Sequence, residues 1–293
     1  MGSAFQAASG LRPGVDADSK IGGWLKARPH FVHRAFIVVG KRTANALCAL
    51  LMLTPAGAQW LKYPAPGIPR TPEGYPDLTA PAPVMADGKP DLSGLWKANN
   101  GKYLQNLAAD LRPGEAPFQP WAAAIYKERQ ENLGRDRPTA RCLPHGVPDE
   151  MAVAGYPFKI LQTPGLILVL YEEFTHYRQI FTDGRPLPSD PNPALVGYSV
   201  GHWEGGALVV DTTGFSDVTW LDDPGHPHTE ALHVIERFHR VDFGHLEIQV
   251  TIDDPKAYTK PWTANETFAL LPDTELLENI CENEKDVRHL VGK

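Results

Sequence analysis

The chain has 293 residues, of which 42 % are hydrophobic and 22 % are charged, and its formal net charge at pH 7 is −7. This length and composition are sufficient for a folded protein with a sizeable apolar core. Binding to nucleic acid requires a basic surface that displaces counterions from phosphates, and this acidic balance excludes that class of protein.

The N-terminal part of the chain predicts export. Lys41 and Arg42 precede an apolar run at residues 44–53, which ends shortly before the small residues 56–58. A basic region, a short apolar region and a small-residue cleavage site are the parts of a secretory signal peptide. The run is too short to span a membrane. We therefore predict an N-terminal extension and signal peptide at residues 1–58 and a periplasmic or extracellular protein. Either translation starts further into the chain, or the basic region is unusually long.

Cys142 and Cys281 are the cysteines that remain after this cleavage, because Cys48 lies in the apolar run. In an oxidising compartment, two distant cysteines predict a disulfide. Closing so long a loop would stabilise the fold by roughly 4–5 kcal/mol in the chain-entropy model. The alternative is two buried free thiols. A catalytic role for Cys142 is less favoured, although Arg141 and His145 are near it in the sequence.

Residues 59–90 are rich in proline, which disfavours both helices and central strands. We predict an extended arm there, either wrapped on the domain or loose, followed by a single β-rich domain at residues 91–293. The domain opens with Gly94-Leu95-Trp96, which resembles the opening signature of lipocalin-like barrels. In that family the tryptophan packs across the floor of the barrel, and the resemblance implies the same position for Trp96.

Residues 120–132 show the clearest helical pattern, because Trp121, Ile125 and Tyr126 recur at helical spacing and charged residues fill the other side. The turn-rich loop at residues 142–148 then contains His145, which we expect to be exposed. After residue 165 the pattern predicts strands.

The segment at residues 166–174 is apolar at first and then has two adjacent carboxylates, Glu172 and Glu173. Successive side chains of a strand point to opposite faces, so one of the two must point inward. Glu172 would share the apolar face of Leu168, where burial would raise the pKa of its carboxyl group unless a cation pairs with it. Arg178 is the candidate partner. The alternative is an exposed Glu172 beside a structural ion pair.

Five further strands are predicted at residues 198–204, 207–211, 232–239, 245–252 and 262–271. Apolar and polar residues alternate cleanly at 232–239 and 245–252 and less regularly at 262–271. The first two flank a Gly-Gly turn and form a hairpin. In this hairpin His202 shares a face with Tyr198 and Glu204, and either that face or the opposite one lines the core.

Candidate site residues are concentrated at residues 223–237, where His226, His228 and His233 lie among carboxylates. If this segment is extended, the first two histidines and Glu230 project from one face. Imidazole is a common metal ligand and titrates near neutral pH, so the segment predicts either a transition-metal site, such as a zinc site, or an acid–base site. We favour metal-free acid–base chemistry by His228 and His233, because the helical spacing of a recognisable zinc site is absent. The alternative is a solvated loop.

The strands, without alternating helices, predict an all-β fold: an antiparallel barrel of the lipocalin or calycin type, or a sandwich, with one or two short helices. The chain also resembles a large, mostly uncharacterised family of exported bacterial proteins between residues 91 and 281. This resemblance rests on residues 142–148, 158–165, 177–185, 201–205, 208–215, 227–237 and 252–262. It implies no reaction or ligand, so it assigns no catalytic residue.

These observations favour an exported, cofactor-independent enzyme with histidine and glutamate as acid and base, acting on a small apolar or aromatic molecule as a lyase, isomerase or hydrolase. The candidate catalytic residues are His228, His233, Glu172, Arg178, His202 and Glu230. The first alternative is a lipocalin-like carrier without catalysis. The second is a metalloenzyme, with a transition metal such as zinc bound by His226, His228 and His233. An enzyme needs converging titratable groups, whereas a carrier needs an apolar pocket. The oligomeric state is open.

Overall fold

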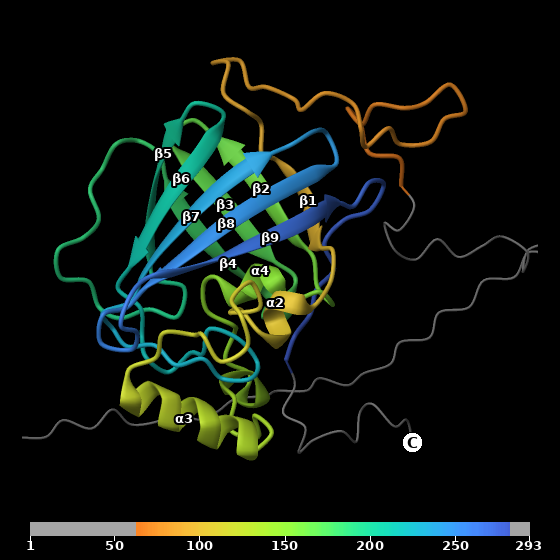
Figure 1. Ribbon diagram of the computed structural model, residues 1–293. Helices are drawn as coiled ribbons and strands as arrows, with labels where there is room; N and C mark the ends of the chain where they lie inside the picture. Colours follow the sequence, from red (N-terminus) through yellow and green to blue (C-terminus); the bar gives the residue numbers. More distant parts are fainter. Residues whose placement is uncertain (1–62, 282–293) are drawn as a thin grey trace, which may run out of the picture. The chain divides into compact units, whose positions relative to one another are not determined.

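The computed structural model describes residues 63–281, so the predicted signal peptide and cleavage site lie outside the described residues. The described residues form nine strands that close into one barrel, in which β9 pairs back to β1 (Figure 1). In chain order the elements are β1 (Gly94–Ala98), α2 (Lys102–Gln105), α3 (Pro120–Glu131), the 3-10 helix η1 (Pro138–Arg141), α4 (Asp149–Ala152), β2 (Phe158–Thr163), β3 (Leu166–Tyr171), the 3-10 helix η2 (Glu173–Thr175), β4 (His176–Phe181), β5 (Tyr198–Glu204), β6 (Ala207–Thr213), β7 (His233–Arg240), β8 (His245–Asp253) and β9 (Trp262–Leu270).

Neighbouring strands are antiparallel except for β4 and β5, which run parallel. This pair matches only Ile180 with Ser199 and Phe181 with Val200, because a long connection at residues 182–197 returns the chain to the side of β4. The loop stands out from the barrel at the left of Figure 1. The predicted barrel is therefore confirmed, with one parallel exception, and the sandwich alternative is excluded.

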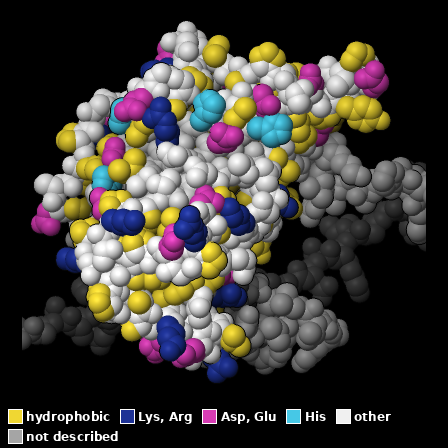
Figure 2. All heavy atoms as spheres, in the orientation of Figure 1, with side chains coloured by type: hydrophobic (Ala, Val, Ile, Leu, Met, Phe, Trp, Pro, Cys, Tyr) yellow, Lys and Arg dark blue, Asp and Glu magenta, His cyan; other side chains and the backbone are white. Residues whose placement is uncertain are grey.

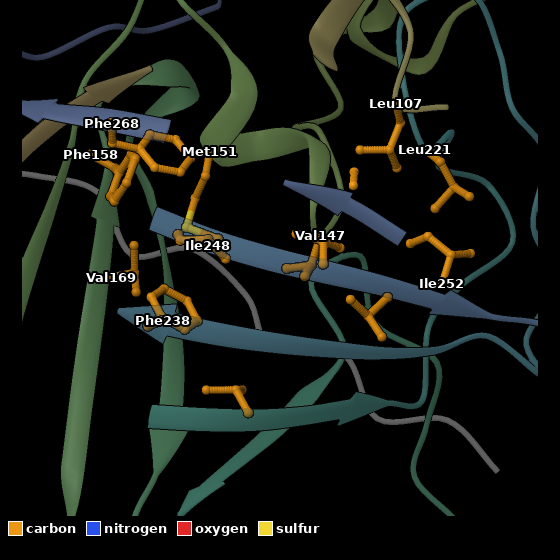
Figure 3. Packing of buried hydrophobic residues seen from close by; sticks show 14 of the residues in the cluster. Leu107, Val147, Met151, Phe158, Val169, Leu221, Phe238, Ile248, Ile252 and Phe268 are labelled. Atoms are coloured by element: carbon orange, nitrogen blue, oxygen red, sulfur yellow. The ribbon is translucent and has the colours of Figure 1, made fainter. Parts of the chain in front are cut away.

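The strands enclose a core because their apolar residues alternate along the chain. In β8 the alternating residues Leu246, Ile248, Val250 and Ile252 are fully buried, as the sequence pattern predicts. Figure 3 shows side chains from several strands meeting inside, with Met151 of α4 inserted near Ile248. Together with α2 and α3, α4 lies at the lower end of the barrel in Figure 1, and it closes that end.

The Gly-x-Trp segment opens β1, and its tryptophan belongs to the core. Trp96 is fully buried, and its indole N–H donates to the carbonyl oxygen of Leu92 at 3.0 Å. The guanidinium of Arg240 lies 4.9 Å from the centre of the indole ring. Gly94 is tightly packed, because a Cβ atom there would lie 2.6 Å from a terminal methyl carbon of Leu270 and 3.1 Å from the indole nitrogen of Trp96, so these side chains would have to shift.

The described part of the proline-rich arm is wrapped on the barrel. The backbone N–H of Gly244 donates to the carbonyl oxygen of Leu78 at 2.7 Å, and that of Phe243 donates to Ala80 at 2.8 Å. These contacts hold residues 78–80 beside the turn between β7 and β8, and Arg70 pairs with Asp273 after β9.

The predicted helix at residues 120–132 is confirmed as α3, and the predicted disulfide joins Cys142 to Cys281, whose Cα atoms lie 5.5 Å apart. Within residues 63–281, no helix combines the length and apolarity needed to cross a bilayer.

Candidate ligand groove and buried histidine–carboxylate cluster

The three histidines of residues 223–237 have separate partners. His226 Nδ1 lies 2.5 Å from Asp222, His228 Nε2 lies 2.8 Å from the hydroxyl of Thr219, and His233 Nε2 lies 2.9 Å from Asp211. Glu230 is exposed. The segment is a loop as far as β7 and is not an extended strand, so these side chains do not project from one face. Among the described residues, the group that could hold a metal ion contains none of them.

His226 and His228 are nevertheless buried, with exposures of 1 % and 5 %. The ring of His226 lies 4.2 Å from that of Tyr126, measured between centroids, and Asp222 also accepts the backbone N–H of His226 at 2.9 Å. Burial lowers the pKa of His228, so this histidine is neutral at pH 7. The contacts of His226 with Asp222 and of His228 with Thr219 hold the loop before β7 in place. Acid–base catalysis by His228 stays a prediction.

Glu172 and Arg178, which were predicted to form an ion pair, do not contact each other. Glu173 is buried and Glu172 is half-buried, because the buried face of β3 is that of Ile167, Val169 and Tyr171, and Glu173 continues this face into the 3-10 turn that follows. The expectation that Glu172 points inward took the opposite face of the strand, that of Leu168, as the inner one. Glu172 accepts the backbone N–H of Leu277 at 2.8 Å. The predicted pair of Glu172 with Arg178 is therefore wrong.

Arg178 and His202 lie on opposite sides of the barrel wall. Arg178 is inside, where it forms a bidentate ion pair with Glu236. His202 is exposed on the outer face and lies 3.1 Å from Glu204. Ser199 of the same strand is buried, which shows that the His202 face does not line the core.

A different group of titratable side chains converges at the end of the barrel that α4 closes. His145 Nδ1 lies 2.5 Å from Glu173, and its Nε2 lies 3.5 Å from both Asp149 and Asp223. Glu150 accompanies them, and His145, Glu150 and Glu173 each offer a ligand atom within 4.8 Å of the others. We call these five residues, with His176, the buried cluster. The expectation that His145 is exposed is wrong, since its side chain is 9 % exposed.

The charges of the buried cluster are strongly coupled. Burial disfavours the imidazolium of His145, but the carboxylates around it, led by Asp149, outweigh burial and raise its pKa. Burial raises the pKa of Glu150 to about 7, against the opposing effect of His176, and it raises the pKa of Asp149 well above the usual range. The space beside His145 is only about 10 Å³, enough for one water molecule or ion.

The C-terminal segment holds two elements of the buried cluster in place. The disulfide attaches it to Cys142, three residues before His145. Asn279 accepts the backbone N–H of Phe174 at 3.2 Å and, through its carbonyl oxygen, the hydroxyl of Thr175 at 2.9 Å. The turn that carries Glu173 and the loop that carries His145 are therefore tied to the same short segment.

A groove of about 480 Å³ opens on the outer side of the barrel, between β4, β5 and residues 182–197. We call it the aromatic groove. It exists because β4 and β5 share only two residue pairs and the long loop stands away from them. Tyr177 and Tyr198, 58 % and 38 % exposed, lie on it. Its lining is Tyr177, Gln179, Phe181, Arg185, Pro186, Pro188, Val196, Gly197, Tyr198, Ser199 and Val200.

A second outer groove, of about 580 Å³, lies over β7, β8 and β9 and is polar. Figure 2 shows basic, acidic and histidine side chains interspersed on this face. They are largely paired, since Arg237 lies 2.8 Å from Glu204 and His239 lies 3.8 Å from Glu247. This surface lacks the aromatic walls that hold small apolar molecules.

The sequence contains weak signals for the buried cluster. His145 and Asp149 are four residues apart, and Asp149 and Glu150 are adjacent acidic residues after a proline. This spacing is not helical, because α4 begins at Asp149 and His145 lies in the loop before it, so the contact depends on how that loop folds. The aromatic groove has no such signal, since it depends on where the loop at residues 182–197 returns.

Comparison with known proteins does not assign the chain to a family. No family model and no curated protein matches it. Among solved structures, a mutant of the fluorescent protein UnaG is similar with 12 % identity over 61 % of this chain and 96 % of its own, at a TM-score of 0.27. Similarity at this level carries no argument about function, and membership of an exported bacterial family stays a prediction.

Proposed function

We propose that this protein binds a small, uncharged and largely apolar molecule that contains an aromatic ring, and that it does so in the aromatic groove. The observation that carries the proposal is a cavity of about 480 Å³, which is within the usual range for small-molecule sites, with Tyr177, Phe181 and Tyr198 among its lining residues. Aromatic side chains bury large areas and stack on flat ligands, which favours such a ligand over a flexible polar one.

The charges at the aromatic groove support an uncharged ligand. Arg185 forms an ion pair with Asp183 at 2.6 Å, and its guanidinium covers the ring of Phe181 at 3.8 Å. The only cation of the lining is therefore already paired. Gln179 supplies an amide that can donate to or accept from one polar group of the ligand.

The geometry favours binding over acid–base catalysis at this site. The lining residues of the aromatic groove include no histidine and no carboxylate. The titratable groups that do converge lie in the buried cluster, where the adjacent space of about 10 Å³ is too small for an organic substrate. The carrier alternative is thus better supported than the enzyme, and catalysis stays a prediction.

Titration with the neutral dye Nile red, followed by its fluorescence, tests the proposal. We expect saturable binding and at least a tenfold increase in Kd for Tyr177→Ala/Tyr198→Ala, which corresponds to about 1.4 kcal/mol. Tyr75→Ala is the matched control, because Tyr75 is 71 % exposed on the arm and lies outside the groove lining. Unchanged dye affinity in the double variant would overturn the proposal.

Competition experiments test the charge of the ligand. 2-Naphthol and 2-naphthoate have the same ring system and differ in charge at pH 7. We expect 2-naphthol to displace Nile red at a concentration at least tenfold lower than 2-naphthoate. Preference for the anion would show that Arg185 leaves Asp183 to bind it, and the assignment of an uncharged ligand would then be wrong.

A further inference from the structure

The buried cluster contains a set of donor atoms that the proposed binding function does not use. His145 comes from the loop before α4, Glu150 from α4 and Glu173 from η2, so three separate segments converge on one point. All three side chains are buried, with exposures of 9 %, 3 % and 6 %. One imidazole nitrogen and two carboxylate oxygens lie within 4.8 Å of one another.

The spacing of these atoms is close to that of a metal coordination sphere. Nitrogen and oxygen ligands bind a zinc ion at about 2.0–2.2 Å, which places neighbouring ligands roughly 3–3.5 Å apart in a tetrahedral site. The donor atoms of the cluster therefore need only small inward shifts. The contact of 2.5 Å between His145 and Glu173 would lengthen as both turn toward the ion.

Glu150 gives an independent indication of a ligand. Its side chain is 1 % exposed, and neither carboxylate oxygen has a hydrogen-bond partner among the described residues. Its nearest cationic group is the imidazole of His176, at 3.3 Å. A buried carboxylate without hydrogen bonds is destabilising, and His176 lies near only one of its two oxygens, so a cation at this position would offset the rest of the cost.

The wider charge balance also favours a cation. The carboxyl groups of Asp149, Glu150, Glu173 and Asp223 surround the imidazoles of His145 and His176, and Arg137 at the rim lies 3.5 Å from Asp223. Four potential anions thus face three potential cations. Asp222, which also acts electrostatically on Asp149, increases the negative excess, although it is paired with His226.

We propose that His145, Glu150 and Glu173 bind one divalent transition-metal ion, of which Zn²⁺ is the best-suited example. Mixed imidazole and carboxylate ligands favour such ions over Ca²⁺ or Mg²⁺, which prefer oxygen ligands alone. His176 and Asp149 orient the ligands from outside the set. His176 Nδ1 lies 2.9 Å from the carbonyl oxygen of Glu173, and Asp149 lies on the Nε2 side of His145.

This site is distinct from the histidines at residues 226–233, which were predicted as metal ligands from the sequence. It also lies apart from the aromatic groove, with which it shares no lining residue. Metal binding would therefore hold the loop of His145, α4 and η2 together at the closed end of the barrel, while leaving binding of small molecules in the groove unchanged.

Metal analysis and titration of the full chain test this proposal. After treatment with a chelator and dialysis, we expect uptake of about one equivalent of Zn²⁺ or Co²⁺, a Co²⁺ absorption spectrum typical of bound imidazole and carboxylate, and a higher Tm with Zn²⁺. Glu150→Gln and Glu173→Gln should weaken Zn²⁺ binding at least tenfold. Glu172→Gln is the matched control, because Glu172 is adjacent to Glu173 and lies outside the donor set.

The outcomes separate the two proposals. If the full chain takes up less than about a tenth of an equivalent of both metals, or if the Glu150 and Glu173 variants bind Zn²⁺ as tightly as Glu172→Gln does, there is no metal site here. Circular dichroism confirms that each variant is folded, and Gln preserves side-chain shape. Nile red affinity should be the same with and without metal, so failure of one proposal leaves the other intact.

Discussion

Glu236→Gln should destabilise the barrel far more than its modest change in shape suggests. Glu236 and Arg178 are 0 % and 1 % exposed, and the two side chains form a bidentate pair across the interior. The guanidinium also donates to Ser199 at 3.0 Å and to Thr212 at 2.8 Å. Gln can accept only one of the two hydrogen bonds and carries no charge, so the substitution leaves Arg178 buried without a counter-ion.

The expected cost follows from this burial. Removing one partner of a buried pair costs about 3–5 kcal/mol. Because Gln keeps one acceptor and both hydroxyl groups remain, we expect a value near the lower end, about 3 kcal/mol. For a domain of this size that corresponds to a fall in Tm of roughly 6–12 °C. Guanidinium unfolding at pH 7.5, followed by near-ultraviolet circular dichroism, measures the free energy directly.

Glu204→Gln is the matched control, since Glu204 makes a similar contact with Arg237 at 2.8 Å on the outer face, where both side chains are about half exposed. Solvent screens that pair, and we expect no measurable change. Arg178→Met/Glu236→Leu should be more stable than Glu236→Gln, because neither charge is then left unpaired. An equal effect of Glu236→Gln and Glu204→Gln would refute the reasoning.

Four further outcomes are expected. Replacing both Cys142 and Cys281 by serine should lower the unfolding free energy by roughly 4–5 kcal/mol in guanidinium unfolding, and a loss below 1 kcal/mol would contradict the loop-closure argument. Burial lowers the pKa of His228, so the unfolded chain takes up a proton that the folded protein refuses; stability should fall as the pH drops below about 6.5, and His228→Gln should flatten this slope between pH 7 and 5. Burial, and then Glu236, raises the pKa of Glu266, so this carboxyl group destabilises the folded protein increasingly as the pH rises. The Tm of Glu266→Gln should therefore exceed that of the unsubstituted protein by more at pH 8 than at pH 5. An equal difference in Tm at both pH values would contradict this. The intact mass of the exported protein should match a chain that begins at Gln59, and a mass that includes residues 1–58 would exclude cleavage there.

The strands that could be predicted are those whose alternation is regular. β8 contains a long segment in which every second residue is apolar, β6 opens with four apolar residues, and Gly205-Gly206 between β5 and β6 supplies the turn. The parallel contact of β4 with β5 could not be predicted in this way. It depends on the path of residues 182–197, whose proline-rich sequence has no periodicity that would indicate a direction.

The site was harder to predict because it depends on residues where the periodicity stops. The expectation for Glu172 took the face of Leu168 as the inner face of β3, whereas the buried face is that of Ile167, Val169 and Tyr171, and Glu173 continues it. Residues 166–171 are all apolar or aromatic, so no alternation in the sequence shows which face points inward. His145 likewise depends on a loop held by a disulfide to a distant segment, a relation that no local pattern contains.

The disulfide has a further consequence for how the barrel is assembled. It makes residues 142–281, with β2 through β9, one covalent ring, and it leaves β1 outside. β1 pairs with β2 over three residues and with β9 over three residues, so the wall of the barrel is completed by a short strand that belongs to the free N-terminal portion. This division suits fragment complementation. A peptide that contains β1 and Trp96, supplied separately, would dock between β2 and β9 and complete the barrel wall.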